Sequence, residues 1–486
     1  MARLTAKRFK EVIMIPYNNF TFFLWLLLPV VPAIILGMVQ ASPKTRSLWI
    51  LHSSIIMLYF ILRPQDVFDQ AVMYFIWEFL IIRLYLKYRQ SEVRQNRASV
   101  FYLALTASLL PLIFIKFVST PEINALQTLF GLQNSKTLST HSGQVVQVVH
   151  SLTNKLASVN SRAGTPSLAK LGSNGLASTN LGSGNLSSAN SGTANLGAVG
   201  LNQLATTTIG NSIFGFLGVS YVTFRIVGTL IEIRDGLIKE VGLGDFISFV
   251  LFFPTLASGP IDRYRRFLKD LRKTLTRQEY LTYLIQGLEY ISRGFLYKFI
   301  IAYLINEYAL SKLTHTHTLW SNVQYMYAYS AYLFFDFAGY SAFAIGVSLF
   351  FGINTPENFK APFWSKNIKD FWNRWHISLS MWFRDYIYMR FMLDSAKKKR
   401  INNRYIASAT GYLLLFLLMG LWHGTQWHYI IYGLYMALLM IGFEFLERFN
   451  KAKHFWGEGK SWDMLARFFT LQFVCFGLLI FSGRIF

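Results

Sequence analysis

Long apolar runs recur along most of this 486-residue chain and are separated by short polar or charged stretches. Several runs approach the roughly 20 residues that a helix needs to cross the hydrocarbon core of a bilayer. The pattern therefore predicts an all-α polytopic membrane protein with about 8–11 transmembrane helices plus re-entrant and interfacial helices. The runs lie at 20–39, 48–62, 71–82, 98–115, 212–233, 246–257, 281–305, 325–351, 406–421, 428–446 and 468–482.

One run is too short to span a membrane by itself. Phe246–Leu256 leads directly into Ala257-Ser258-Gly259-Pro260. A half-length helix that ends in Gly-Pro indicates a re-entrant or broken helix, which is tolerated at membrane depth only where protein shields its backbone.

Residues 119–209 interrupt the apolar pattern with a segment rich in Ser, Asn, Gly, Thr and Ala. Leucines recur every five residues between 171 and 201, as in pentapeptide-repeat β-helices, but Ser191 breaks the register after a few repeats. The composition favours a disordered, low-complexity loop, and its low charge favours the outer face of the membrane. We expect it to separate N-terminal transmembrane helices (1–118) from a catalytic membrane core (210–486).

Composition and charge support a membrane location. The chain is 53% hydrophobic and 15% charged, whereas soluble domains carry about 25% charged residues. The 47 basic residues exceed the 24 acidic ones, but long apolar runs argue against a nucleic-acid-binding protein. Basic cytoplasmic loops facing anionic lipid, and an acidic partner, explain the excess better. Cys475 is the only cysteine, so the chain has no internal disulfide or thiolate metal site.

Basic residues gather in two runs. Lys397-Lys398-Lys399-Arg400 form one of them, and seven basic residues between Arg263 and Arg277 form the other. Each can be a loop that sets topology, or a surface that binds an acidic partner, and the two interpretations are compatible.

Two segments carry polar groups where a lipid environment disfavours them, which makes them candidates for chemistry. His376 lies in Arg374-Trp375-His376-Ile377-Ser378-Leu379-Ser380, and His423 lies in Gly420-Leu421-Trp422-His423-Gly424 at the end of a long uncharged run. A histidine can act as a general base near neutral pH, although a hydrogen-bonded structural histidine is the alternative for each. His315 and His317 lie in a Thr-rich loop, with no acidic residue or cysteine close enough in sequence to suggest a metal site.

These two segments resemble the two signature regions of the membrane-bound O-acyltransferase (MBOAT) family. Tyr332–Ser341, with Ala344-Ile345-Gly346 soon after it, resembles the family's Asp-Phe-Ser-Gly-Tyr-Ser region, and Pro356-Glu357-Asn358-Phe359 matches the stretch that follows. Four motifs in the family's order identify the chain as a member, with an MBOAT-like membrane core.

Within the family, several segments resemble the D-alanyl transfer (DltB) branch of Gram-positive bacteria, and the alginate-type O-acetyltransferases are the alternative. These segments are Val219–Arg225, Glu232–Gly236, Phe253–Arg263 and Phe476–Arg484. The resemblance implies that D-alanine arrives as a thioester on the phosphopantetheine arm of an acidic cytoplasmic carrier protein. It then passes to a hydroxyl acceptor in the teichoic and lipoteichoic acid pathway, beside other D-alanylation membrane proteins and with no bound cofactor.

The resemblance also implies roles for individual residues. His423 is expected to be the general base, and His376 to hold the arm or assist proton transfer. An acidic carrier with an apolar patch would dock on Met389, Phe391 and Met392 and on Lys397, Lys398, Lys399 and Arg400. An interfacial helix resting in lipid is the alternative for this stretch.

A hypothesis from another functional class is a transporter or flippase for a lipid-linked substrate, with His423 and Glu78 as polar relays. Against it, the chain shows no inverted repeat, and its polar residues gather in two motifs rather than along a path.

Overall fold

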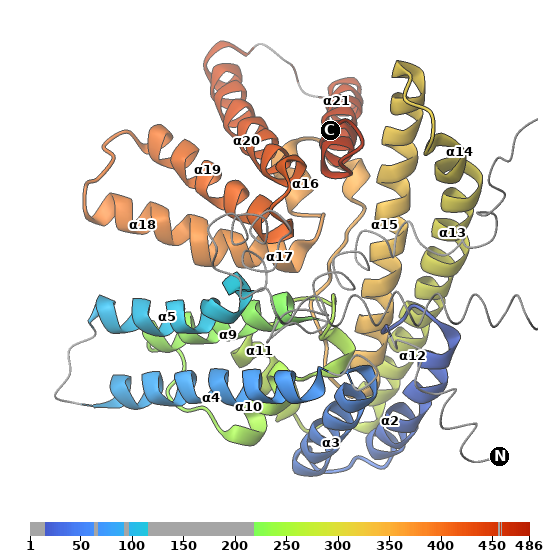
Figure 1. Cartoon of the computed structure of the whole chain (residues 1–486), viewed down its shortest axis with the longest axis vertical. Helices are drawn as coiled ribbons and strands as arrows, with labels where there is room; N and C mark the ends of the chain where they lie inside the picture. The colour runs from blue at the N-terminus through green and yellow to red at the C-terminus, as the bar shows by residue number, and fades with distance from the viewer. Residues whose placement is uncertain (1–14, 63–66, 92–96, 115–217, 455–456, 458) are drawn as a thin grey trace, which may run out of the picture. The chain divides into compact units, whose positions relative to one another are not determined.

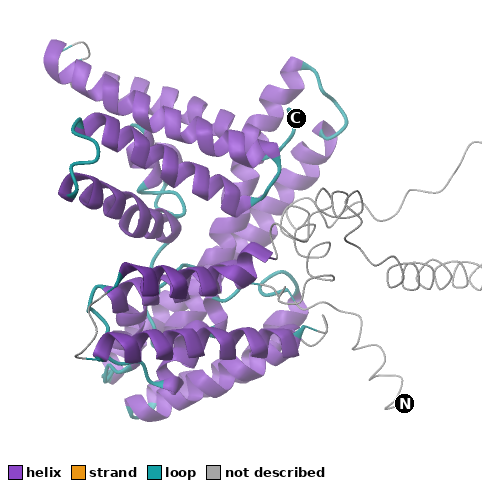
Figure 2. Ribbon diagram, turned by 60° about the vertical axis from the view of Figure 1, so that its left-hand side comes forward, coloured by secondary structure: helices purple, strands orange, loops and turns teal. Residues whose placement is uncertain are grey.

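The computed structural model describes residues 15–62, 67–91, 97–114, 218–454, 457 and 459–486. These residues form helices joined by loops, with no strand among them, as Figure 2 shows. A single β-bridge pairs Phe359 with Trp375 within the described ranges. The all-α prediction is confirmed, whereas the predicted low-complexity loop, 119–209, lies outside the described residues.

Six of the described helices are long and apolar enough to cross a bilayer, which confirms a multi-pass membrane protein. They are α2 (Phe20–Met38), α3 (Pro43–Leu62), α15 (Leu319–Phe350), α19 (Arg404–His423), α20 (Trp427–Lys453) and α21 (Lys460–Phe481). Other apolar runs form shorter helices, such as α5 (Ala98–Ile113), or more charged ones, such as α4 (Phe68–Gln90).

Helix α9 (Val219–Arg234) runs beside α4 and α5 (Figure 1) and is buried along almost its whole length. Its buried Arg225 donates hydrogen bonds to the backbone oxygens of Phe249, at 3.1 Å, and Thr255, at 2.6 Å. These bonds satisfy carbonyl groups that the next segment leaves without helical partners.

That next segment is the broken helix expected from the sequence. Helix α10 (Leu243–Val250) ends early and is followed by the short η3 (Phe253–Thr255) and by non-helical residues up to α11 (Tyr264–Leu271). Residues 251–262 are buried almost throughout, so protein shields this irregular backbone as membrane depth would require.

The chain is then helical without interruption from Arg277 to Leu313 and packs along α15 (Figure 1). Two parts of this helix have π-helical geometry, which is often found at functional sites. Its segments are α12 (Arg277–Gly294), η4 (Phe295–Ala302), α13 (Tyr303–Ile305), η5 (Asn306–Leu310) and α14 (Ser311–Leu313).

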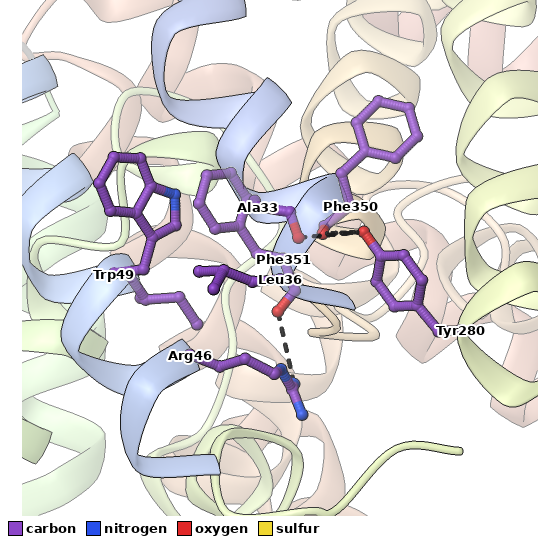
Figure 3. A pocket seen from close by; sticks show the side chains of 8 residues that line it. Ala33, Leu36, Arg46, Trp49, Tyr280, Phe350 and Phe351 are labelled. Atoms are coloured by element: carbon purple, nitrogen blue, oxygen red, sulfur yellow. Dashed lines mark hydrogen bonds between the residues drawn. The ribbon is translucent and has the colours of Figure 1, made fainter. Parts of the chain in front are cut away.

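Buried polar side chains tie the end of α15 to the N-terminal helices (Figure 3). The Tyr280 hydroxyl lies 2.8 Å from the backbone oxygen of Phe350 and 3.3 Å from that of Ala33. Arg46 of α3 donates to the backbone oxygen of Phe351 at 3.5 Å. Because the last carbonyls of a helix have no partner within it, these bonds stabilise the point where α2, α3, α12 and α15 meet.

The remaining helices surround the two histidine segments. After η6 (Pro362–Trp364) and α16 (Ile368–Trp372), a continuous helix comprises α17 (Ile377–Phe383), η7 (Arg384–Tyr388) and α18 (Met389–Lys397). Helices α19 and α20 cross closely because glycine occupies the contact: a Cβ at Gly420 would lie 2.5 Å from the backbone oxygen of Tyr429.

Candidate active site

His376 lies in a tight turn between α16 and α17. Its φ of +43° is in the left-handed region, which non-glycine residues rarely adopt and which often marks a functional constraint. The turn begins where α16 ends after Trp372, and His376 is the residue that precedes the first turn of α17. The backbone therefore holds the imidazole in a conformation that the surrounding contacts must maintain.

Those contacts centre on the buried side chain of Asn358. Its Oδ1 accepts a hydrogen bond from the Ser378 hydroxyl at 2.6 Å, and its Nδ2 donates to the Ser341 hydroxyl at 3.1 Å. The backbone N–H of Ile261 donates to the Ser378 oxygen at 2.9 Å. Four segments that the sequence analysis singled out separately, around residues 261, 341, 358 and 378, therefore meet beside His376.

The imidazole of His376 is buried, with 4% of the residue exposed. The edge of the Phe337 ring meets it at a centroid distance of 4.8 Å, and the ring of Tyr221 lies 6.5 Å away. Its Nε2 atom has no hydrogen-bond partner among the described residues. Burial lowers the pKa of His376 to about 3, so the ring is neutral at physiological pH. A neutral, buried imidazole with a free nitrogen can bind a polar group that enters from outside.

His423 occupies a different setting, as the last residue of α19. It is half-buried, and the ring of Phe481 meets it edge-on at 4.8 Å. The rings of Trp422, Tyr429 and Tyr432 lie 4.6, 6.0 and 6.5 Å from it. The imidazole therefore stands at the end of a membrane helix inside an aromatic wall that α19, α20 and α21 build together.

Two aromatic rings connect the histidines. Tyr221 of α9 lies 6.5 Å from His376 and 5.9 Å from Trp422, whose own ring neighbours His423. Tyr221 lies within one of the motifs, but the sequence indicates no role for it, because nothing in its spacing shows that α9 enters between the two histidine segments.

The two histidines lie near different positions along the axis of helix α15. Phe337, which contacts His376, is in the middle of α15, whereas Asn322 is near its first turn. Arg484 follows Phe481 by three residues and donates to Asn322 at 2.8 Å, so His423 lies near the beginning of α15. Asn322 and Phe337 are roughly 22 Å apart at the α-helical rise of 1.5 Å per residue.

The residues expected to dock a carrier lie on α18, which continues the helix that His376 precedes. Met389 is 44% exposed, whereas Phe391 and Met392 are half-buried, and Phe391 lies against α19 near Gly411. All four basic residues from Lys397 to Arg400 are exposed. Asp394 pairs with Lys398 at 2.7 Å and with Arg400 at 3.4 Å, so one carboxylate offsets one of four positive charges.

The other basic run is largely neutralised by neighbouring acidic groups. Five of its seven basic residues form ion pairs, some of them with well-buried carboxylates such as Glu232 and Asp262. The pairs are Arg263–Asp385, Arg265–Glu232, Arg266–Asp262, Arg272–Asp245 and Lys273–Glu279. This run is bound into the fold, whereas the Lys397–Arg400 run faces outward.

Among the described residues, no group of three or more His, Cys, Asp or Glu side chains is placed to bind a metal ion. The site consists of two imidazoles, hydroxyl and amide groups, and aromatic rings. Such groups can position an acyl donor, accept a proton from a hydroxyl and exclude water.

Known proteins are similar over the region that holds this site. Residues 202–481 match the model of the membrane-bound O-acyltransferase family. A teichoic acid D-alanyltransferase of Bacillus subtilis is 56% identical, over 56% of this chain and 70% of that protein. One of Lacticaseibacillus rhamnosus is 48% identical, over 56% of this chain and 70% of that protein. A probable alginate O-acetylase of Pseudomonas putida is 36% identical, over 45% of this chain and 43% of that protein.

Proposed function

Because this chain belongs to the membrane-bound O-acyltransferase family, we propose that it transfers D-alanine from a carrier protein to a hydroxyl acceptor for the D-alanylation of teichoic acids. The donor is the phosphopantetheine thioester of a small acidic carrier protein, and the acceptor leads to lipoteichoic and wall teichoic acid. The names of the relatives at 56% and 48% identity support the acyl group and the pathway. The observation that carries the proposal is the pair of histidines at the two ends of the Tyr221–Trp422 contact.

The chemistry needs few groups because a thioester is already activated. The acceptor oxygen attacks the thioester carbonyl carbon while His423 takes the hydroxyl proton. The carbon–sulfur bond then breaks, the ester forms, and the proton passes from His423 to the departing thiolate. His423 thus begins and ends neutral, and no external oxidant, reductant or metal takes part in these proton and acyl transfers.

His376 has a different role in this proposal. As a neutral ring it can donate one hydrogen bond and accept another, and its unpartnered Nε2 is free for the phosphopantetheine arm or the acyl carbonyl. Because Asn358 and Ser378 fix the turn that bears it, the bond would be made without moving the backbone. We therefore assign His376 to holding the donor.

Charge distribution supports a cytoplasmic entry and an outward acceptor. Arg266 and Asp270 of the Arg263–Arg277 run bond to Asn354, just beyond the C-terminal end of α15. The opposite end of α15 lies near His423. Because basic loops remain on the cytoplasmic side, the donor would enter near α11 and α18, and His423 would face the outer side.

The two basic runs also differ as docking surfaces. An acidic carrier gains most from cations that are not already neutralised, and the Lys397–Arg400 run retains most of its charge. Met389 and Leu393, which are 44% and 65% exposed, add apolar surface one to two turns away. We therefore place the carrier on α18 rather than on α11.

The activity is tested with purified protein in liposomes, D-[14C]alanyl-carrier on one side and lipoteichoic acid as acceptor. We expect loss of the thioester and gain of hydroxylamine-sensitive label in the polymer, both dependent on the protein. The same carrier loaded with an acetyl group is the control donor. Faster transfer of acetyl than of D-alanyl would contradict the proposal and favour an alginate-type O-acetyltransferase.

The docking surface is tested by reversing the charge of two basic residues in each of the two basic runs. Lys397→Glu with Lys399→Glu should weaken carrier binding about tenfold or more at low salt, with less effect at high salt. The control is Lys269→Glu with Arg277→Glu, which makes the same charge change in the other run. Leu393→Asp should also weaken binding, whereas wild-type binding by both α18 variants would place the carrier elsewhere.

A further inference from the structure

The residues that follow α21 turn back onto the protein. Gly483 adopts a left-handed φ of +75°, and its N–H donates to the backbone oxygen of Ile480 at 3.1 Å. A Cβ at this position would lie 3.3 Å from the ring of His428, so glycine suits both the turn and the space. The turn directs Arg484 towards the beginning of α15.

Arg484 connects three parts of the fold. Its Nη2 donates to the backbone oxygen of Leu313 at 2.9 Å and to that of Thr316, and its Nε donates to the side-chain oxygen of Asn322 at 2.8 Å. Its guanidinium lies 4.1 Å from the centre of the Tyr325 ring. Leu313 ends α14, and the last carbonyls of a helix need partners from outside it, so Arg484 caps that helix while it holds α15.

The residue three positions earlier contacts the proposed base. Phe481 meets the His423 ring edge-on at 4.8 Å with an interplanar angle of 84°. Its ring also lies 5.1 Å from Tyr429 and 5.2 Å from Tyr432 of α20. Phe481 is therefore the contribution of α21 to the wall around His423, and its place depends on how the end of α21 is held.

We propose that Arg484 is a positioning residue for His423. By fixing the end of α21 to the α14–α15 connection, it keeps the Phe481 ring against the imidazole and sets the direction in which His423 faces. The inference rests on the proposed function only for the role of His423 as the base. The fork of the guanidinium matters because three acceptors lie around it, and the single ammonium of a lysine cannot reproduce that arrangement.

The first test measures transfer by Arg484→Ala, Arg484→Lys and the matched control Lys460→Ala, at the opposite end of the same helix. Misplacing a catalytic group by a fraction of an ångström to 1 Å costs up to about 100-fold in rate. We expect kcat to fall roughly tenfold in Arg484→Ala, less in Arg484→Lys, and KM for the carrier thioester to change by less than about twofold. Lys460→Ala should match the wild type.

A second measurement does not depend on D-alanyl transfer. Diethylpyrocarbonate modifies accessible neutral imidazoles, and mass spectrometry gives the modification rate of His423 relative to that of His454, an exposed histidine just after the C-terminal end of α20. Arg484→Ala should change this ratio at least about threefold, and Phe481→Leu, which keeps the Arg484 anchor, should change it in the same direction. If the wild type transfers no D-alanine, this ratio still tests the positioning role.

The outcomes separate positioning from folding. In a His423→Ala background, adding Arg484→Ala should cause no further loss of the residual rate, because residues that act through one group are not additive. The proposal would be overturned if Arg484→Ala left the relative modification rate of His423 unchanged. So would a further loss of rate in the double variant, which would make Arg484 important for the fold as a whole.

Discussion

The two histidines of this site are held in opposite ways. His376 is 4% exposed and has a left-handed backbone. Its turn is hydrogen-bonded to Asn358 and Ile261, and Asn358 is bonded in its turn to Ser341. His423 is half-buried at the end of a membrane helix, and aromatic rings from three helices surround it. The turn that bears one imidazole is fixed by a polar network, whereas the other imidazole is enclosed by aromatic rings, with the ring of Phe481 edge-on against it.

The difference suits two tasks. A group that holds the donor gains from a rigid backbone, because the entropy of ordering it is lost on folding rather than on binding. A base that must take a proton and return it needs access to the acceptor, which a half-buried place at a helix end provides. The histidines are therefore expected to respond differently to substitution, and four measurements can break or sharpen this contrast.

The largest effect is expected at the base. His423→Ala should lower the rate of D-alanyl transfer by about 10²–10⁴-fold, the usual loss when a general base is removed. Expression and carrier binding should remain at wild-type levels, because α18 is a separate surface. The control is His52→Ala, which removes a histidine of α3 that lies outside the site. Near-normal transfer by His423→Ala would remove the base from the proposal and with it the contrast.

A smaller loss is expected at His376, and the replacement decides its size. His376→Ala should reduce transfer by roughly 10–100-fold, since a misplaced donor reacts slowly. His376→Asn should retain several-fold more activity, because asparagine tolerates the left-handed backbone and keeps a hydrogen-bonding amide. Equal loss in both variants would instead indicate proton transfer at His376, a role that an amide cannot perform.

The network that holds His376 should matter less than the ring itself. Asn358→Ala leaves the Ser378 and Ser341 hydroxyls without their partner, which costs about 1–3 kcal/mol of stability and several-fold in transfer. If Asn358 acts only by holding the turn, the double variant with His376→Ala should be no slower than His376→Ala alone. A multiplicative loss would mean that Asn358 contacts the substrate itself.

Much of this fold follows from the apolar pattern. The runs at 20–39, 98–115 and 406–421 correspond to α2, α5 and α19 within a few residues, because the hydrophobic length that lipid requires is visible in any single sequence. The broken helix was also predictable, since Gly259-Pro260 follows an apolar run of half the spanning length. The structure begins α10 at Leu243 and ends it at Val250, where Arg225 donates hydrogen bonds to the backbone oxygens of Phe249 and Val250.

The geometry of the site was predictable only in part. The histidines could be singled out because polar residues are rare in apolar runs. The Asn358–Ser378 bond, however, joins residues twenty positions apart, across the short helices η6 and α16 and the turns around them. No periodicity encodes such a pairing. Tyr221 is harder still, since an aromatic residue on a fully buried helix gives no sign of which neighbour it will meet. Phe481 and Arg484 depend in the same way on the return of the chain end to α15.

The smallest effect concerns stability against pH and isolates His376 from His423. Burial lowers the pKa of His376 to about 3, whereas in an unfolded chain a histidine has a pKa near 6.5. Between these values the unfolded state binds the proton and the folded state does not, so the folded protein loses stability as the pH falls below about 6.5. From pH 7.5 to pH 5.5 this single group should cost about 1 kcal/mol.

His376→Asn removes the group that titrates while it keeps the backbone conformation. Its melting temperature in detergent should therefore decline less between pH 7.5 and pH 5.5 than that of the wild type, by the equivalent of about 1 kcal/mol. If His376→Asn loses stability as steeply as the wild type, the imidazole is already solvated in the folded protein. It would then not be the fixed, neutral member of the pair.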